Sequence, residues 1–323
     1  MHKVPEAVAA ALEHDALIEA PCPQVLPPWI EAETFQRSRS SRRGSVTPFE
    51  YRSRGELWHA GHPAMPKLDA NLTLLFNELD FVDRFRAAAD AGFKAVEYLF
   101  PYNYDTRVLK QKLTDFGLVQ VLHNLPAGNW ANGERGIACL PTRVAEFEAG
   151  VDQAIKYATA LDCGQVNCLA GIRPPDLDAN DARETFIKNL SYAAPRFKAA
   201  GIKLLIESIN TRDIPDFFLS RTTQALGIIE AVGSDNLFLQ YDIYHMHVME
   251  EDLASTIERN LKLIGHVQIA DSPGRHEPGT GEIDYRSLLE FIDRVGYSGW
   301  IGCEYNPARR TDAGLAWARP YLT

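Results

Sequence analysis

The chain alternates between short apolar runs and longer segments in which apolar residues recur at helical spacing. From residue 65 onward, eight apolar runs rich in β-branched residues predict buried strands. They span residues 68–76, 95–100, 118–125, 165–171, 203–210, 237–244, 265–271 and 300–305. After each run, a segment with helical periodicity predicts a helix, at 78–91, 105–116, 142–161, 179–200, 222–233, 250–262, 284–295 and 311–321. The pattern is a strand followed by a helix, repeated eight times.

Residues at the ends of these segments support the predicted helices. Thr142 and Asp284 are capping residues at helix starts, and Gly117 and Gly201 stand where helices end. Eight strand–helix units in about 260 residues match the count and length of a (β/α)8 barrel. The predicted fold class is therefore α/β, a TIM barrel. A doubly wound sheet is the alternative, and it is weaker because no GxGxxG motif follows the first strand.

The first 64 residues differ from the rest of the chain. They contain PCPQVLPPW and the basic serine run RSRSSRRGS, and only residues 5–19 have a helical pattern. Such a segment buries too little apolar surface to offset its ordering entropy. We therefore expect a poorly ordered extension over 1–64 and a barrel catalytic domain over 65–323. A second hypothesis is that Met65 is the natural start and that the residues before it are not native.

Composition narrows the classes of partner. Hydrophobic residues make up 46% of the 323 residues, and the net charge is −10. This charge argues against nucleic acid, whose affinity for proteins comes mostly from Lys and Arg on phosphates, and against an anionic membrane surface. No stretch approaches the roughly 20 apolar residues of a membrane span. A small-molecule substrate remains, while the oligomeric state, a homo-oligomer included, stays open.

The cysteines indicate the compartment. The chain has five, an odd number, and none is spaced CxxC. Buried free thiols in a reducing environment are the expected state. Together with an N-terminal AVAAAL run that is too short and too acidic for a signal peptide, this pattern predicts a cytoplasmic protein.

Four side chains that carry oxygen interrupt the last four apolar runs. They are Glu207 in LLIESIN, Asp242 in FLQYDIYH, Gln268 in HVQIADS and Glu304 in WIGCEYNP. An unpaired charge inside such a run costs several kcal/mol, roughly. Because barrel enzymes carry their chemistry at the carboxyl ends of the strands, these four should converge on one pocket. One such residue alone is more simply a hydrogen-bonded buried group, but four on successive strands indicate a site.

The predicted site favours a hard cation. Three carboxylates repel one another unless protons or a cation compensate them. A set of oxygen ligands without Cys or His favours Mg²⁺ or Mn²⁺ over Zn²⁺. A glutamine inside a core strand is unusual, and Gln268 is explained if its neutral amide offers the cation one more oxygen ligand.

Other polar residues lie near the predicted pocket. His245 and His247 follow Asp242, and on an extended chain only one of them can face the pocket, which we expect to be His245. Arg275 could hold an anionic group of the substrate, although a surface charge explains it equally well. His123 in VLHNLP and Glu97 in AVEYLF are further candidates for substrate contact, with a satisfied core group as the alternative.

Several longer motifs resemble the hydroxypyruvate isomerase family, part of the wider xylose-isomerase-like barrel group. They are NLTLLF, VEYLFPY, HNLPAGNW, IESINTRDIP, QYDIYHMH, HVQIADSPGRHEPGTGEIDY and GCEYNP. The resemblance covers residue 65 to the C-terminus. It implies a divalent metal held by Glu207, Asp242, Gln268 and Glu304, with Glu207 and Glu304 as the acid/base pair. It also implies that His245 and Arg275 contact the substrate.

The resemblance implies an interconversion of hydroxypyruvate and tartronate semialdehyde through a metal-stabilised enediolate. Related enzymes act on four-carbon 2-oxo-tetronates, and no residue decides the chain length. Ketose 3-epimerases of the wider group usually carry histidine in place of Gln268, which weakens that alternative. An abasic-site endonuclease needs several ligating histidines and a basic groove. A non-catalytic sugar-acid binder would not need the complete carboxylate set.

Overall fold

The computed structural model describes residues 65–249 and 252–322. The predicted extension over 1–64, its helical segment at 5–19 and Cys22 lie outside the described residues. The other four cysteines, Cys139, Cys163, Cys168 and Cys303, are buried and free. Among the described helices, none combines the length and the apolarity that crossing a membrane requires.

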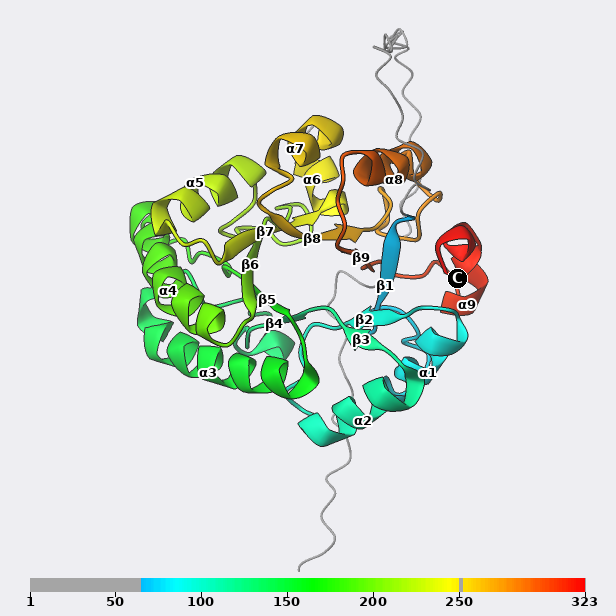
Figure 1. Ribbon diagram of the computed structural model, residues 1–323. Helices are drawn as coiled ribbons and strands as arrows, with labels where there is room; N and C mark the ends of the chain where they lie inside the picture. Colours follow the sequence, from blue (N-terminus) through cyan, green and yellow to red (C-terminus); the bar gives the residue numbers. More distant parts are fainter. Residues whose placement is uncertain (1–64, 250–251, 323) are drawn as a thin grey trace, which may run out of the picture.

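Nine strands of the described chain form one parallel sheet that closes into a barrel (Figure 1). They are β1 (Lys67–Asn71), β2 (Ala95–Glu97), β3 (Val119–Gln120), β4 (His123–Asn124), β5 (Gln165–Cys168), β6 (Lys203–Glu207), β7 (Leu237–Asp242), β8 (Ile264–Ile269) and β9 (Trp300–Cys303). The sheet order runs β3-β2-β1-β9-β8-β7-β6-β5-β4. The two end strands, β3 and β4, are successive pieces of one extended segment, so the sheet closes on itself. The barrel thus has the eight predicted strand positions, with the third split in two.

The helices lie outside the strands and surround them (Figure 1). The described residues form α1 (Phe81–Asp90), α2 (Thr106–Phe116), α3 (Val144–Leu161), α4 (Ala179–Ala199), α5 (Thr222–Val232), α6 (Ile243–Met249), α7 (Leu253–Asn260), α8 (Tyr285–Arg294) and α9 (Thr311–Gly314). Short 3₁₀ turns cover η2 (Trp130–Asn132), η3 (Pro141–Arg143), η4 (Leu315–Trp317) and η5 (Arg319–Tyr321). The α/β barrel predicted from the alternating pattern is confirmed.

Apolar packing divides into two parts. A large cluster fills the space between strands and helices, with buried aromatic side chains such as Phe85 and Phe186. A much smaller cluster contains Ala95, Val121, Leu122 and Leu205. The other inward positions of the strands are largely polar, and Asp69, Glu97, Asn167, His266 and Gln268 are each at most 2% exposed. Polar groups buried in this way need partners inside the barrel.

Several predicted strands end up to three residues early, and four predicted segments differ more clearly from the structure. Strand β1 ends at Asn71, whose side chain accepts from the Thr73 N–H at 3.0 Å, so the apolar residues that follow form a buried turn. Residues 243–249 are helical instead of extended. Helix α3 begins at Val144 after a 3₁₀ turn, without a cap from Thr142. The last predicted helix is broken into one α-helical turn and two 3₁₀ turns. Asp284 caps α8 as expected, because its side chain accepts from Ser287 N–H.

The glycine-rich loop after β8 is organised by one buried carboxylate. Asp271 accepts hydrogen bonds from the backbone N–H groups of Ser272, Gly279, Gly281 and Ile283, at 2.8 to 3.1 Å. A side chain at Gly281 would place its Cβ 2.2 Å from the Ser272 carbonyl oxygen. The loop is thereby folded back on the end of β8, and it carries Arg275 into the barrel mouth.

A close backbone approach at Gly136 gives a stability prediction. Gly136 has φ +112°, and a Cβ there would lie 2.5 Å from the Leu169 carbonyl oxygen. We expect Gly136→Ala to lower the free energy of unfolding by about 1–3 kcal/mol, because the backbone must leave a conformation that only glycine adopts easily. Gly227 in α5 has open space around it, so Gly227→Ala should raise the same quantity by about 0.5–1 kcal/mol. Urea unfolding of both variants measures the two changes. Changes of the same sign would contradict the inference that Gly136 requires glycine and that Gly227 does not.

Candidate active site

The four predicted strand-end residues converge at one end of the barrel. Glu207 and Asp242 are the last residues of β6 and β7, Gln268 lies near the end of β8, and Glu304 directly follows β9. All four are buried, at 1% to 8% exposure. Glu207, Gln268 and Glu304 line a small cavity. Its whole wall consists of Asn71, Glu97, Tyr98, Leu99, Leu122, Asn124, Glu207, Gln240, Gln268 and Glu304. Asp242 adjoins this wall through its contact with Glu304.

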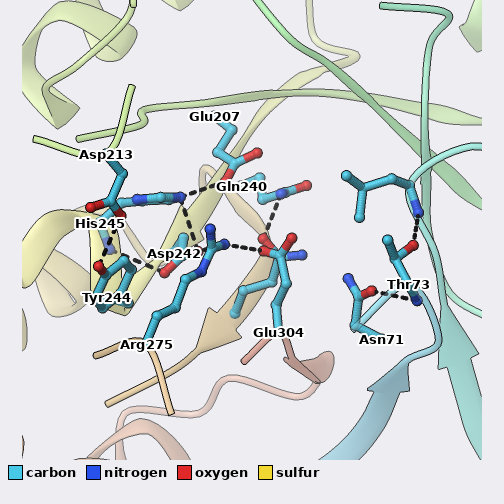
Figure 2. A network of polar contacts seen from close by, with 12 residues as sticks. Asn71, Thr73, Glu207, Asp213, Gln240, Asp242, Tyr244, His245, Arg275 and Glu304 are labelled. Atoms are coloured by element: carbon cyan, nitrogen blue, oxygen red, sulfur yellow. Dashed lines mark hydrogen bonds and ion pairs between the residues drawn. The ribbon is translucent and has the colours of Figure 1, made fainter. Parts of the chain in front are cut away.

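Arg275 supplies positive charge to this end of the barrel. Its Nη2 lies 3.2 Å from Glu304 Oε2 and 3.6 Å from Asp242 Oδ2 (Figure 2). The side chain is 7% exposed, and its guanidinium lies over the Tyr244 ring, with the Cζ atom 5.4 Å from the ring centroid. Its backbone has φ +53°. Arg275 therefore lies beside the carboxylates at this end of the barrel, while its contact with a substrate stays a prediction. Arg275 contacts the carboxylates directly, whereas its sequence context predicted a contact with the substrate or a surface position.

The three carboxylates are poorly accommodated as charges. Burial is the largest cause that raises the pKa of Glu207 well above its usual value, followed by the charges of Glu304 and Asp242. Burial also raises the pKa of Asp242, against the opposing effect of Arg275. Glu304 has its pKa raised to about 8, mainly by burial, with Arg275 again opposing the shift. One guanidinium therefore does not compensate the whole group.

His245 contacts the carboxylates from a helix. It lies on α6, where the Asp242 side chain accepts from the His245 N–H at 3.2 Å, in the manner of a helix cap. The alternating pattern expected of an extended strand is therefore wrong for residues 243–249, although His245 does point inward and is 2% exposed. An N-cap residue directly before IYHMHVM is the signal that could have revealed this helix.

The tautomer of His245 follows from Asn210. The Asn210 side-chain oxygen accepts from the backbone N–H groups of Arg212 and Asp213 at 3.1 and 2.8 Å, so its amide group points the other way. That group donates to His245 Nδ1 at 2.7 Å. The proton of the neutral ring is then on Nε2, which faces Asp242 at 3.6 Å and Glu207 at 3.9 Å. His245 is thus placed as a donor and not as a metal ligand.

Glu97 lies in the cavity wall with its carboxylate fully engaged. It accepts from Asn71 Nδ2 at 2.9 Å, from Gln268 Nε2 at 2.8 Å and from His266 Nε2 at 2.7 Å. Burial opposes its charge, but the contacts with His266, Gln268 and Asn71 lower the pKa of Glu97 below its usual value. Its role as a substrate contact stays a prediction.

His123 is fully buried beside the cavity wall. Its Nδ1 lies 3.1 Å from the Asn124 carbonyl oxygen and 3.3 Å from the Tyr102 hydroxyl. Burial lowers its pKa to about 4. The ring is not part of the cavity wall described above, so the structure offers a core role for it, and substrate contact stays a prediction.

Sequence reasoning missed two amides in the site. Asn167 Nδ2 donates to Glu207 Oε2 at 2.9 Å, and Gln240 Nε2 donates to Gln268 Oε1 at 2.6 Å. Both interrupt apolar runs, in QVNC and LFLQYD, as the four predicted residues do. The same signal would have found them if it had been applied to positions before the strand ends.

The chemistry of the donors fits a cation. Glu207 and Asp242 each offer an oxygen within 4.8 Å of the other and of a ring nitrogen of His245. Asp242 Oδ2 and Glu304 Oε2 are buried and accept no hydrogen bond from any described residue, although both lie near Arg275. Because His245 Nε2 carries its proton, the available ligand atoms are oxygens. Buried, mutually repelling oxygens of this kind are typical of a site for a hard divalent cation.

Comparison with known proteins identifies the family. A family model described as "Xylose isomerase-like TIM barrel" matches residues 85–321. The chain belongs to the xylose isomerase-like TIM barrel family. The barrel expected from the resemblance is therefore confirmed at the level of the family.

Individual relatives within this family include isomerases. Hydroxypyruvate isomerase of Escherichia coli is 51% identical over 257 residues, which are 80% of this chain and 100% of that protein. A 2-oxo-tetronate isomerase of Cupriavidus necator is 46% identical and covers 80% of this chain and 99% of its own length. A solved structure titled AP endonuclease, family 2, from Brucella melitensis has 46% identity and a TM-score of 0.78, covering 80% of this chain and 99% of that chain.

The raised pKa values of Glu207, Asp242 and Glu304 predict that the stability of the protein depends on pH. We expect the free energy of unfolding of chelator-treated protein to fall as pH rises from about 6.5, above which the buried histidines no longer oppose the effect, to about 8. In that range folded Glu304 still holds a proton that the unfolded chain has released, so raising the pH favours unfolding. Glu207 and Asp242 act in the same direction.

Urea unfolding at several pH values measures this dependence. Glu304→Gln removes one titrating group while keeping nearly the same shape, and it should flatten the slope. A slope that is equally steep in this variant would show that Glu304 is not responsible.

Proposed function

We propose that the chain is an aldose–ketose isomerase of small hydroxy-oxo acids and that it interconverts hydroxypyruvate and tartronate semialdehyde. The observation that carries the proposal is the convergence of Glu207, Glu304 and Gln268 on the wall of a single small polar cavity, with the third buried carboxylate, Asp242, in contact with Glu304. The relative with 51% identity is named for this reaction. The polar wall of this cavity suits a substrate that carries several oxygen atoms.

In this proposal Glu207, Asp242, Gln268 and Glu304 hold one divalent cation, Mg²⁺ or Mn²⁺. A bound cation would stabilise negative charge on the substrate oxygens and acidify the carbon beside the carbonyl. Its support comes from the buried acceptor oxygens of Asp242 and Glu304 and from the absence of Cys and His among the four chosen ligands.

The proposed acid and base are Glu207 and Glu304. One removes a proton from the carbon beside the carbonyl, the other returns a proton to the former carbonyl carbon, and the proton of the substrate hydroxyl passes to the former carbonyl oxygen. They enter the cavity from different strands, β6 and the end of β9, so they can approach a small substrate from two sides. Asn167 fixes Oε2 of Glu207, which leaves Oε1 for proton transfer. Positioned groups of this kind contribute about 10²–10⁴-fold in rate.

His245 and Arg275 complete the proposed site as hydrogen-bond donors to the substrate. The Nε2–H of His245 is directed by Asn210 toward the carboxylates, where it can donate to a substrate oxygen. The guanidinium of Arg275 can bind the substrate carboxylate, and its forked donors suit that shape. Arg275 also compensates Asp242 and Glu304, so it would serve both the protein and the substrate.

A four-carbon substrate is the second candidate. The Cupriavidus necator relative is named a 2-oxo-tetronate isomerase and is 46% identical, only slightly below the hydroxypyruvate isomerase. Both reactions use the same proton transfer and differ in the length of chain that the cavity accepts. The order of the two identities favours hydroxypyruvate.

Strand cleavage at abasic sites is less well supported, although one similar structure has an endonuclease title. The cavity wall over the described residues contains no histidine, and His245 and His266 are engaged through Asn210 and Glu97. The net charge of −10 also disfavours a phosphate backbone.

Removal of one carboxylate tests the proposed acid/base pair. We expect Mg²⁺- or Mn²⁺-loaded protein to convert hydroxypyruvate and Glu304→Gln to lower kcat by about 10²–10⁴-fold, because the amide cannot exchange the proton. Glu290→Gln, at an exposed position on α8, is the matched control and should keep wild-type activity. Chelation should abolish turnover in both the wild type and this control.

The same assay with a 2-oxo-tetronate separates the two substrates, and a duplex with one abasic site tests strand cleavage. Higher kcat/KM on the four-carbon acid would replace hydroxypyruvate as the substrate. Full activity of Glu304→Gln would remove this residue from the mechanism.

A further inference from the structure

A second group of ionisable residues lies inside the barrel, next to the proposed cation site. Asp69 on β1, Glu97 on β2 and His266 on β8 are 0%, 1% and 0% exposed, and each offers an atom within 4.8 Å of the others. Asp69 and His266 were not singled out from the sequence, and the proposed mechanism uses none of the three. Burying three such groups is costly unless they satisfy one another.

Glu97 is the acceptor at the centre of this group. Asn71 and Gln268 donate to its Oε1, and His266 donates to its Oε2. The Glu97 carboxylate on β2 reaches Gln268 on β8 across the two strands between them, β1 and β9. On β9, Gly302 pairs with both Asp69 and Gln268, and it has no side chain that would block this contact. A Cβ at Gly302 would lie 2.6 Å from Glu97 Oε1. Glycine at this position therefore leaves the space that Glu97 occupies.

Asp69 completes the shell around Glu97. Within the described residues, neither Asp69 oxygen has a donor from any other group. The acid is satisfied only if it keeps its own proton and donates it to Glu97. Burial, and after it the neighbouring charge of Glu97, raise the pKa of Asp69 well above its usual value, in agreement with this arrangement. Glu97 then accepts four hydrogen bonds and donates none.

An acceptor at this position determines the direction of the Gln268 amide. Glu97 can only accept, so the NH₂ end of Gln268 must face it. The oxygen of Gln268 then faces the opposite side, where Gln240 Nε2 donates to it at 2.6 Å. If the amide were reversed, two oxygens would face each other 2.8 Å apart.

We propose that Glu97, supported by Asp69, Asn71 and His266, is a positioning residue that turns the oxygen of Gln268 toward the cavity it shares with Glu207 and Glu304, where one lone pair accepts from Gln240 and the other is left for the cation. The inference rests on the proposed function, since it explains how a neutral side chain is made a reliable oxygen ligand. Partners of metal ligands that orient them in this way typically contribute about 10–100-fold to metal affinity.

The alternative occupant of the same group is a second metal ion. His266 Nε2 and Glu97 Oε2 are already 2.7 Å apart in a hydrogen bond, and Glu97 Oε1 has two donors. A metal would have to displace these donors, so hydrogen bonding is the better explanation of the group.

A double-mutant cycle tests the positioning role. In the wild-type background, Glu97→Gln should raise the Kd for Mn²⁺ by about 10–100-fold, because an amide at residue 97 no longer forces the Gln268 oxygen outward. In a Gln268→Glu background both ends of residue 268 are oxygens and need no orientation. There, Glu97→Gln should leave the Kd unchanged or lower it, since it removes a contact between two carboxylates.

Two further variants guard against misfolding. Gly302→Ala displaces the Glu97 carboxylate without changing its chemistry, and it should weaken Mn²⁺ binding in the same direction. Gly227→Ala, with open space around it, is the matched control and should bind like the wild type. Asp69→Asn keeps a donor toward Glu97, so its Kd should stay within about threefold of the wild-type value.

Electron paramagnetic resonance titration of chelator-treated, folded protein with Mn²⁺ gives both Kd and stoichiometry. Equal losses from Glu97→Gln in both backgrounds would indicate a general structural role and overturn the inference. A second bound ion that disappears in Asp69→Asn would also overturn it. If the wild type binds Mn²⁺ tightly and Glu97→Gln has the same Kd, the positioning role alone is refuted. If the wild type binds no Mn²⁺, the proposed function is refuted as well.

Discussion

The gathering of three carboxylates in the buried mouth of the barrel is the constraint on which the rest of the site depends. Glu207, Asp242 and Glu304 are each at most 8% exposed, and burial, followed by repulsion from neighbouring carboxylates, raises the pKa of each. Arg275 is the cation placed among them, and it arrives on a loop that Asp271 folds through four backbone hydrogen bonds. The loop folded by Asp271 thus brings positive charge to the place where the strands end.

Neutral side chains hold the charged ones in place. Asn167 fixes one oxygen of Glu207, Asn210 selects the tautomer of His245, and Gln240 contacts the oxygen of Gln268. Amides suit this task because each carries a donor and an acceptor at opposite ends, so a fixed partner at one end determines what the other end presents. Hydrogen bonds of this kind rigidify a polar interior that would otherwise cost stability. The inside of this barrel is therefore a polar framework above a small apolar cluster.

The family alone does not determine the reaction. Relatives that share the barrel are named hydroxypyruvate isomerase, 2-oxo-tetronate isomerase and AP endonuclease, and a common fold supports many chemistries at the ends of its strands. The side chains around the cavity bear on the choice among these reactions. Oxygens surround the cavity, while His245 is held as a donor and His266 is bonded to Glu97. That set suits proton transfer on a small oxygen-rich substrate better than hydrolysis that relies on histidine-bound metals.

The sequence by itself determined the barrel and the four residues at the ends of its last strands, because apolar periodicity is local and a charge inside an apolar run is visible without coordinates. It did not reveal helix α6, since the cap that Asp242 provides competes with an apolar pattern that also fits a strand. Only the tertiary structure decided how Arg275 pairs, which nitrogen of His245 carries the proton and which way Gln268 points. These depend on contacts such as that between Glu97 and Gln268, which are 171 residues apart in the chain, and no local pattern contains the direction of a hydrogen bond between such distant partners.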